Sequence, residues 1–209
     1  MIDIHSHVIY GVDDGAQAPA DSIAILEMAA AAGTTDIVAT PHANNSFRYQ
    51  PEVNRARQAE LQAVMGGRIR IHMGCDFLLS YENIQDALVN RSKYTVNGKN
   101  YLLVEFSDLL IPKTTGATFT ELLEAGMVPI ITHPERNWLL TQRLAEIESW
   151  VAGGALVQVT SQSLAGLFGS KARKFGEELM NRNLVHFIAS DAHSVSERNP
   201  RLDAAYALI

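Results

Sequence analysis

Short apolar runs recur along the chain, and segments with helical periodicity separate them. Each run is apolar throughout rather than at alternate positions, which is typical of parallel strands buried on both faces. The pattern predicts seven strands, at Ile2–His5, Asp36–Thr40, Ile69–Gly74, Tyr101–Glu105, Val128–Thr132, Leu156–Thr160 and Val185–Ala189.

The intervening segments carry helix signals at their ends. Pro19 stands in the first turn of the first segment and Gly33 at its end, the positions that proline and glycine favour. Further helices are predicted at Glu52–Met65, Asn83–Val89, Phe119–Ala125, Thr141–Ala152 and Ser170–Arg182. The alternation repeats every 30 residues or so, about the length of a βα unit. We therefore expect one α/β domain over residues 1–209, with a closed or nearly closed parallel barrel favoured over an open doubly wound sheet.

Composition narrows the classes of protein that fit. No apolar run approaches about 18 residues and no basic segment precedes an apolar one, so we expect neither a transmembrane helix nor a signal peptide. The net charge of −6 argues against broad nucleic-acid binding. The single cysteine, Cys75, excludes an internal disulfide and predicts a reducing, cytoplasmic location. A thiolate phosphate loop needs an arginine six positions after its cysteine, where this chain has Tyr81, so Cys75 is expected to pack as a small apolar residue.

Metal-binding side chains gather where the predicted strands end. In parallel α/β proteins the chemistry collects beyond the carboxyl ends of the strands. Six of the seven ends carry His, Asp or Glu, namely His5, His7 and Asp14 after the first, His42 after the second, Asp76 after the third, Glu105 on the fourth, His133 after the fifth, and Asp191 and His193 after the seventh. His72 and His186 do not lie at carboxyl ends and are expected to be structural.

Each of these residues has a structural alternative when taken singly. Asp13, Asp14 and Gly15 could form a turn, and Glu105 could be half of an ion pair. Together, however, five histidines and at least four carboxylates exceed the four ligands of one zinc ion. The set predicts two or three divalent ions of the manganese, iron or zinc kind.

The motifs HSH, TPH, HPER and SDAH occur in this order at the predicted strand ends, from Ile2 to about Leu202. This ordered set resembles the polymerase and histidinol phosphatase (PHP) superfamily. VDDG, THPERN, QVTSQSLAGLFG and Arg198 after ASDAH are similar to its branch of bacterial protein-tyrosine phosphatases from capsule and exopolysaccharide operons. The resemblance implies a distorted seven-stranded βα barrel with a trinuclear, commonly manganese-activated site.

The resemblance also implies a role for each candidate residue. One metal would be held by His5, His7, Asp76 and Asp191, a second by Asp76, Glu105 and His133, and a third by Asp14, His42 and His193. Arg136 and Arg198 match the arginines that bind the substrate phosphate in this branch.

Two features depart from the family pattern. The family usually has glutamate where this chain has Asp76, so the shorter side chain is expected to bridge two metals less well. The chain also ends at Leu208-Ile209, inside a predicted helix, whereas family members generally continue. We therefore expect a piece of the outer helical layer to be missing.

The predicted activity is hydrolysis of phosphotyrosine in a protein, with the tail of a bacterial tyrosine kinase as the expected substrate. Metal-bound hydroxide would attack in line, Arg136 and Arg198 would hold the phosphate, and Asp191 or His193 would orient the water or protonate the tyrosyl oxygen. Without a transmembrane segment, the protein would reach a membrane-bound kinase by recruitment. Three alternatives stay open: a small-molecule phosphatase of the histidinol phosphatase kind, an exonuclease, and a metal-stabilised phosphotyrosine-binding module without turnover. The acidic charge disfavours the exonuclease, and the oligomeric state is left open.

Overall fold

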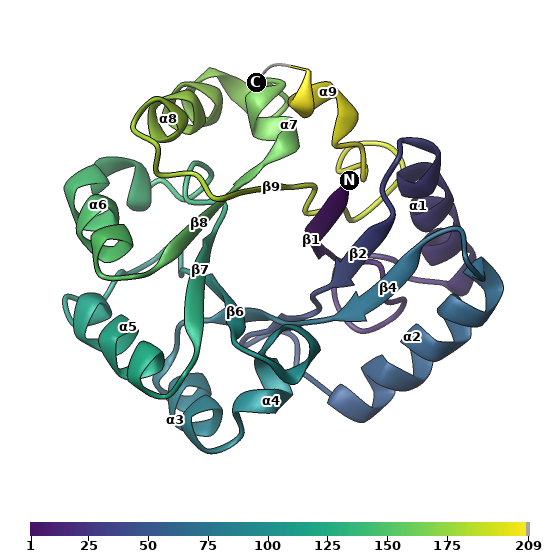
Figure 1. Ribbon diagram of the computed structural model, residues 1–209, viewed down its shortest axis with the longest axis horizontal. Helices are drawn as coiled ribbons and strands as arrows, with labels where there is room; N and C mark the ends of the chain where they lie inside the picture. Colours follow the sequence, from purple (N-terminus) through teal and green to yellow (C-terminus); the bar gives the residue numbers. More distant parts are fainter. Residues whose placement is uncertain (208–209) are drawn as a thin grey trace.

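Parallel strands lie around the centre of the molecule, and helices surround them on the outside (Figure 1). The computed structural model describes residues 1–207. Its strands are β1 (Ile2–Ser6), β2 (Asp36–Ala39), β3 (His42–Ala43), β4 (Arg70–Met73), β5 (Asp76–Leu78), β6 (Tyr101–Glu105), β7 (Val128–Thr132), β8 (Leu156–Thr160) and β9 (Phe187–Ala189). Every pairing between them is parallel, as the apolar runs predicted.

The predicted parallel α/β class is confirmed, but the strand count and the closure of the predicted closed or nearly closed seven-stranded barrel are not. The described residues form nine strands in two sheets, ordered β1-β2-β4 and β3-β5-β6-β7-β8-β9. Two of these strands were not predicted: β3 begins just past the predicted Asp36–Thr40, and β5 begins just past the predicted Ile69–Gly74. The pairing is interrupted at Pro41, which has no N–H to donate to a ladder, and at Gly74-Cys75. Past these breaks β3 and β5 pair again, with His42 opposite Asp76. The register is the same before and after the breaks, as the pairs Ala39–Met73 and His42–Asp76 show, and it places two predicted metal ligands side by side.

The sheets also meet where the chain begins and ends. In the described residues β1 and β9 share no ladder, but Ser6 and Ala192 form an isolated bridge. The His7 amide donates to the Ala192 carbonyl at 2.8 Å, and the Asp191 amide donates to the His5 carbonyl at 2.8 Å. These bonds join the two segments that carry the HSH and SDAH motifs.

The helices follow the predicted segments, with shifted ends. They are α1 (Pro19–Ala31), α2 (Pro51–Met65), α3 (Tyr81–Val89), α4 (Arg91–Tyr94), α5 (Thr115–Glu124), α6 (Leu144–Ala152), α7 (Ser161–Leu164), α8 (Gly169–Asn181) and α9 (Asp203–Tyr206), with 3₁₀ turns η1 (Val96–Gly98) and η2 (Leu140–Gln142). The α5 helix begins at Thr115, earlier than the predicted Phe119. The sequence pattern missed its first turn, TGAT, because these residues are small or polar and show no apolar periodicity. The end of the chain at 208–209, where a longer helix was expected, lies outside the described residues. None of the helices in residues 1–207 combines the length and the apolar character that a membrane crossing needs.

An aromatic cluster anchors the carboxyl end of β6. Phe106 stacks on Trp150 of α6 with ring centroids 5.6 Å apart, and Phe119 of α5 meets both rings edge-on. All three side chains are buried. Because Phe106 directly follows Glu105, this packing also fixes the end of the strand that carries a predicted metal ligand.

Replacing Phe119 by alanine tests this cluster. Large-to-small changes of a buried phenylalanine cost roughly 3–5 kcal/mol, so Phe119→Ala should lower the free energy of unfolding by about that amount. Urea denaturation followed by circular dichroism measures the loss. Val89→Ala, at a position that is 82% exposed, should change it by less than about 0.5 kcal/mol. Equal losses in the two variants would contradict the packing role.

Candidate metal centre

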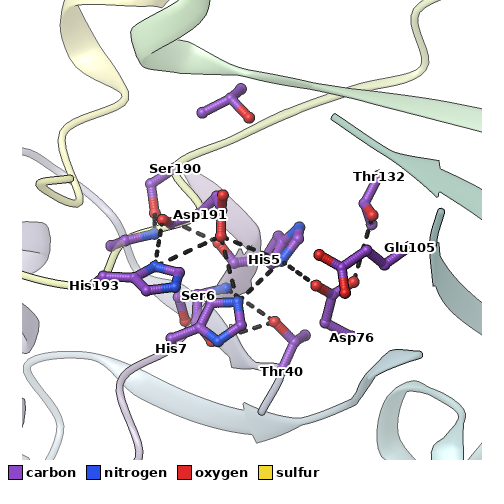
Figure 2. A network of polar contacts seen from close by, with 12 residues as sticks. His5, Ser6, His7, Thr40, Asp76, Glu105, Thr132, Ser190, Asp191 and His193 are labelled. Atoms are coloured by element: carbon purple, nitrogen blue, oxygen red, sulfur yellow. Dashed lines mark hydrogen bonds and ion pairs between the residues drawn. The ribbon is translucent and has the colours of Figure 1, made fainter. Parts of the chain in front are cut away.

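Histidine and carboxylate side chains from distant parts of the chain point toward one centre at the carboxyl ends of the strands (Figure 2). His5 and His7 come from β1 and the residue after it, His42 from β3, Asp76 from β5 and Glu105 from β6. Asp14 lies in the loop after β1, His133 follows β7, and Asp191 and His193 follow β9. The structure therefore brings most of the predicted ligands together.

The first group is formed by His5, His7, Asp76 and Asp191, all buried. The Nε2 atom of His5 lies 3.3 Å from Nε2 of His7, 3.4 Å from Oδ1 of Asp191 and 3.6 Å from Oδ2 of Asp76. Nε2 of His7 is 3.3 Å from the same Asp191 oxygen. Four donor atoms thus face each other across one small space.

A second group joins Asp14 to three imidazoles. Oδ1 of Asp14 lies 3.3 Å from Nε2 of His42 and 3.3 Å from Nε2 of His193. His7 belongs to this group as well as to the first, and its ring centroid is 4.0 Å from that of His193.

The third group places His42 between two carboxylates. Nδ1 of His42 is 3.2 Å from Oδ2 of Asp76 and 3.4 Å from Oε2 of Glu105. His133 lies further out, with its ring centroid 5.4 Å from that of His5, and none of the tight groups among the described residues includes it. It lines a cavity of about 130 Å³ with Glu105 and Arg136.

The donor atoms fit divalent ions. Within residues 1–207, His42 Nδ1, Asp76 Oδ2, Asp191 Oδ1 and His193 Nε2 are buried and have no hydrogen-bond partner. Such atoms are costly unless something binds them. These atoms lie 3.2–3.7 Å from the neighbouring imidazole nitrogens and carboxylate oxygens. Two ligand atoms of a tetrahedral ion with bonds of about 2.1 Å would be about 3.4 Å apart, which is close to these distances.

Partners behind three histidines turn their Nε2 atoms toward the centre. Nδ1 of His5 lies 3.0 Å from Oε1 of Gln158, and Nδ1 of His7 lies 2.7 Å from Oδ2 of Asp13. Nδ1 of His193 faces the carbonyl of Asp191 at 2.9 Å. An imidazole that donates Nδ1–H in this way leaves the Nε2 lone pair for a metal.

Sequence reasoning missed Asp13 and Gln158 as orienting partners. Asp13 was interpreted as a turn residue, although it also accepts the amides of Gly15 and His42. Gln158 lies inside β8 rather than at its end, where ligands were sought. The available signal was an amide in the otherwise apolar run LVQVT, since buried polar side chains need partners.

Asp191 connects this centre to the two predicted phosphate-binding arginines. Its Oδ1 faces His5 and His7, while Oδ2 accepts hydrogen bonds from Arg136 and, at 2.5 Å, from Nη2 of Arg198. The Arg136 guanidinium also lies over the ring of Phe168, 4.3 Å from its centroid. The arginines therefore lie next to the metal-binding side chains.

Asp191 and His133 have positive φ angles, a backbone conformation that residues other than glycine rarely adopt. Asp191 has φ 52° and His133 has φ 34°. A non-glycine residue in this region costs roughly 1–3 kcal/mol and persists where the surroundings fix it. Asp3 helps to fix the backbone at Asp191 through the preceding residue, Ser190. The Asp3 carboxylate accepts hydrogen bonds from the Ser190 amide at 3.0 Å and from the Ser190 hydroxyl at 2.5 Å.

The surrounding groups raise the pKa of His7 and lower the pKa values of His133 and His193. Burial lowers the pKa of His7, but the Asp13 carboxylate outweighs it and raises the value to about 9. Burial, together with Arg136, lowers the pKa of His133 to about 3, and burial with His7 lowers that of His193 to about 4. Burial opposes the charge on Asp191, but His5, His7 and Arg198 hold the pKa of its carboxyl well below the usual range.

The residues expected to be structural lie elsewhere. Nε2 of His72 is 2.9 Å from Oδ1 of Asp36, and Nδ1 of His186 accepts the amide of Val157. Cys75 is fully buried, and burial raises the pKa of its thiol well above the usual value. A buried neutral thiol is not a nucleophile.

Comparison with known proteins identifies the family. Residues 1–209 match the family described as capsular polysaccharide synthesis, CpsB/CapC, and the chain belongs to it. It is 36% identical to the tyrosine-protein phosphatase YwqE of Bacillus subtilis over 203 residues, covering 95% of this chain and 80% of the relative. It is 28% identical to the tyrosine-protein phosphatase CpsB of Streptococcus pneumoniae, covering 100% and 89%.

Solved structures agree. A crystal structure from the study of YwqE from Bacillus subtilis and CpsB from Streptococcus pneumoniae, described as unique metal-dependent tyrosine phosphatases, superposes with a TM-score of 0.91 at 35% identity, over 100% of this chain and 86% of that chain. The fold alone is also similar to hisK of Listeria monocytogenes, assigned as a histidinol phosphatase, with a TM-score of 0.54 at 9% identity over 94% of this chain and 96% of that one. The expected membership of the capsule branch is confirmed.

Metal affinity should depend on pH through His7. The pKa of His7 is raised to about 9, so below that pH the metal-free side chain holds a proton that an ion must displace. Manganese affinity should therefore rise from about pH 6 to about pH 9. Calorimetry in buffers of different ionisation enthalpy measures the released proton. Asp13→Asn, which removes the carboxylate that raises this pKa, should flatten the dependence; an unchanged slope in that variant would contradict the assignment.

Asp76 should be essential for metal binding, because its carboxylate faces both His5 and His42. Asp76→Ala should weaken manganese binding by more than about 100-fold, the upper range for losing an outer partner of a ligand. Asp76→Glu should preserve or raise the affinity, because it restores the longer side chain. Elemental analysis after dialysis measures the content, and Asp36→Ala, at the carboxylate of the separate Asp36–His72 pair, serves as control. Normal metal content in Asp76→Ala would remove this residue from the site.

Proposed function

We propose that this chain is a single-domain, metal-dependent phosphatase that hydrolyses phosphotyrosine in proteins, with a bacterial tyrosine kinase of the capsule and exopolysaccharide system as its substrate. The observation that carries the proposal is the placement of Asp191. One of its oxygens faces two metal-binding imidazoles and the other accepts two guanidinium groups. A phosphate bound at these arginines would lie beside the metals. The names of the relatives support tyrosine phosphatase activity.

The metals would be held by the converging side chains, with manganese as the first choice and iron or zinc as alternatives. We assign two to three ions to His5, His7, Asp14, His42, Asp76, Glu105, His133, Asp191 and His193. Divalent ions supply positive charge at the phosphate and lower the pKa of bound water to about 7. Asp76 fits a ligand shared by two ions, because its Oδ2 faces both the His5 group and the His42 group.

Arg136 and Arg198 would bind the phosphate. Each guanidinium carries five N–H groups, and the bonds to Asp191 use only part of them. Nε of Arg198 is buried and has no partner within residues 1–207, so a donor remains in place for a substrate oxygen. Two guanidinium groups can neutralise a phosphate dianion through charge-assisted hydrogen bonds.

Asp191 and His193 would share the handling of water and protons. Against the opposing effect of burial, His5, His7 and Arg198 keep the Asp191 carboxyl ionised, so it can accept a hydrogen bond from water but has no proton to give. His193 directs Nε2 toward the centre while Nδ1 faces the Asp191 carbonyl. Because the ring is protonated on Nδ1, Nε2 of His193 carries a lone pair, which can bind a metal or accept a hydrogen bond from water but has no proton to give. A cytoplasmic location, expected from the single cysteine, is part of this proposal.

A turnover assay with a phosphotyrosine peptide tests the proposal. Hydrolysis should require manganese and stop when it is chelated. Charge-assisted hydrogen bonds are worth roughly 1.5–3 kcal/mol, so Arg136→Ala or Arg198→Ala should lower kcat/KM by about one to two orders of magnitude. Cys75→Ser, at a buried thiol outside the metal groups, should retain turnover and serves as the matched control.

Two outcomes would contradict it. Inert phosphotyrosine peptides beside good turnover of a sugar or amino-alcohol phosphate would favour the small-molecule phosphatase. Tight binding of the peptide without any turnover by the metal-loaded protein would favour the binding module.

A further inference from the structure

The loops that surround the two arginines expose apolar side chains. Leu109 is 91% exposed and Leu110 66% after β6, Trp138 is 60% exposed after β7, Leu167 is 65% exposed after α7, and Val195 is 42% exposed after β9. We call Leu109, Leu110, Trp138, Leu167 and Val195 the apolar rim. All five follow the carboxyl ends of the consecutive strands β6 to β9, and the loops after β7 and β9 also carry Arg136 and Arg198.

Hydrogen bonds hold the first two of these loops together. The Asn137 side chain donates to the carbonyls of Phe106 at 3.3 Å and Ser107 at 3.2 Å. Nε1 of Trp138 donates to the carbonyl of Asp108 at 3.1 Å. The backbone before Leu109 is therefore fixed against the loop that carries Arg136.

The other two loops are tied to the same arginines. The guanidinium of Arg136 lies over Phe168, the residue after Leu167. Arg198 closes a turn around Val195, because its carbonyl accepts the amides of His193 at 2.8 Å and Ser194 at 3.1 Å. The apolar rim is thus held around the arginines, and a ligand need not order it first.

The apolar rim and the arginines together fit a phosphorylated peptide better than a membrane. Clustered exposed apolar side chains mark interaction sites in proteins. Between them, Arg136 and Arg198 complement a phosphate dianion. A net charge of −6 opposes attraction to an anionic lipid surface, which selects for basic segments.

We propose that the apolar rim binds apolar side chains on either side of the phosphotyrosine in the substrate. This rests on the proposed function and deepens it, because it names the kind of sequence that the site selects. In an extended peptide successive residues are about 3.3 Å apart, so the neighbours of a phosphotyrosine held by the arginines would reach the loops after β6 to β9. A small aryl phosphate would contact the arginines but not the apolar rim.

The test compares three substrates with the manganese-loaded protein: phenyl phosphate and two phosphotyrosine peptides of equal length and charge, flanked by leucine and phenylalanine or by serine. The natural sequence should favour the apolar peptide by about 10-fold in kcat/KM, mainly through KM. Leu109→Ser/Leu110→Ser and Leu167→Ser should each reduce this preference several-fold and leave phenyl phosphate turnover unchanged. Trp138 is kept, because its indole N–H holds the loop. Val89→Ser, at an 82% exposed residue ending α3, should keep the full preference.

Binding of the same peptides as non-hydrolysable phosphonates gives a second reading that does not need turnover. Equal Kd and equal kcat/KM for the two peptides would overturn the proposal, as would an equal loss on all three substrates in the rim variants. Rim-dependent sedimentation with anionic vesicles, or rim-dependent dimerisation without peptide preference, would assign the surface to a membrane or a second copy and also overturn it. Absence of hydrolysis of phenyl phosphate and of both peptides would instead contradict the proposed function, while the Kd ratio still decides the apolar rim.

Discussion

The two oxygens of the Asp191 carboxylate contact different partners, and the arrangement of side chains at the carboxyl ends of the strands depends on these contacts. Oδ1 faces the imidazoles of β1, and Oδ2 holds the guanidinium groups of Arg136 and Arg198. A buried carboxylate can carry charge only where cations and donors surround it, so the loss of any one partner is costly. The strained backbone at Asp191 is held by the bonds from Ser190 to Asp3 and from its own amide to the His5 carbonyl. The position of the two arginines relative to the converging histidines follows from this one residue.

The strand register and the partners behind the histidines serve the same centre. The register that pairs Ala39 of β2 with Met73 of β4 continues unchanged past Pro41 and Gly74-Cys75. The short pairing of β3 with β5 beyond these residues places His42 and Asp76 opposite each other. Behind the histidines, a carboxylate, an amide and a backbone carbonyl each fix one ring. The ring nitrogens are thus oriented without an ion, at the cost of buried polar atoms that have no hydrogen-bond partner within residues 1–207.

The loops at the carboxyl ends of the strands differ between the two sides of the site. Imidazoles and the partly exposed carboxylate of Asp14 lie near β1 and β3. Arginines and exposed apolar side chains lie in the loops after β6 to β9. A phosphotyrosine flanked by apolar residues has the same two parts, an anionic group and apolar neighbours. This match links the proposed chemistry to the proposed choice of peptide, and both depend on loops fixed by hydrogen bonds across sequence gaps of about 30 residues.

The sequence alone determined the parallel α/β class, the approximate strands and helices, and the family, because continuous apolar runs and ordered strand-end motifs are local features. It also marked the histidines and carboxylates that the structure brings together, since chemistry collects at strand ends in this class. It failed on the strand count and on Asp13 and Gln158, because a ladder break or an orienting hydrogen bond depends on what lies opposite in space. Gln158 meets His5 across 153 positions of sequence, and no local pattern reports such a contact. Which donors face each other, and that Asp191 joins them to the arginines, was decided only by the tertiary structure, since strand order and side-chain direction set those distances.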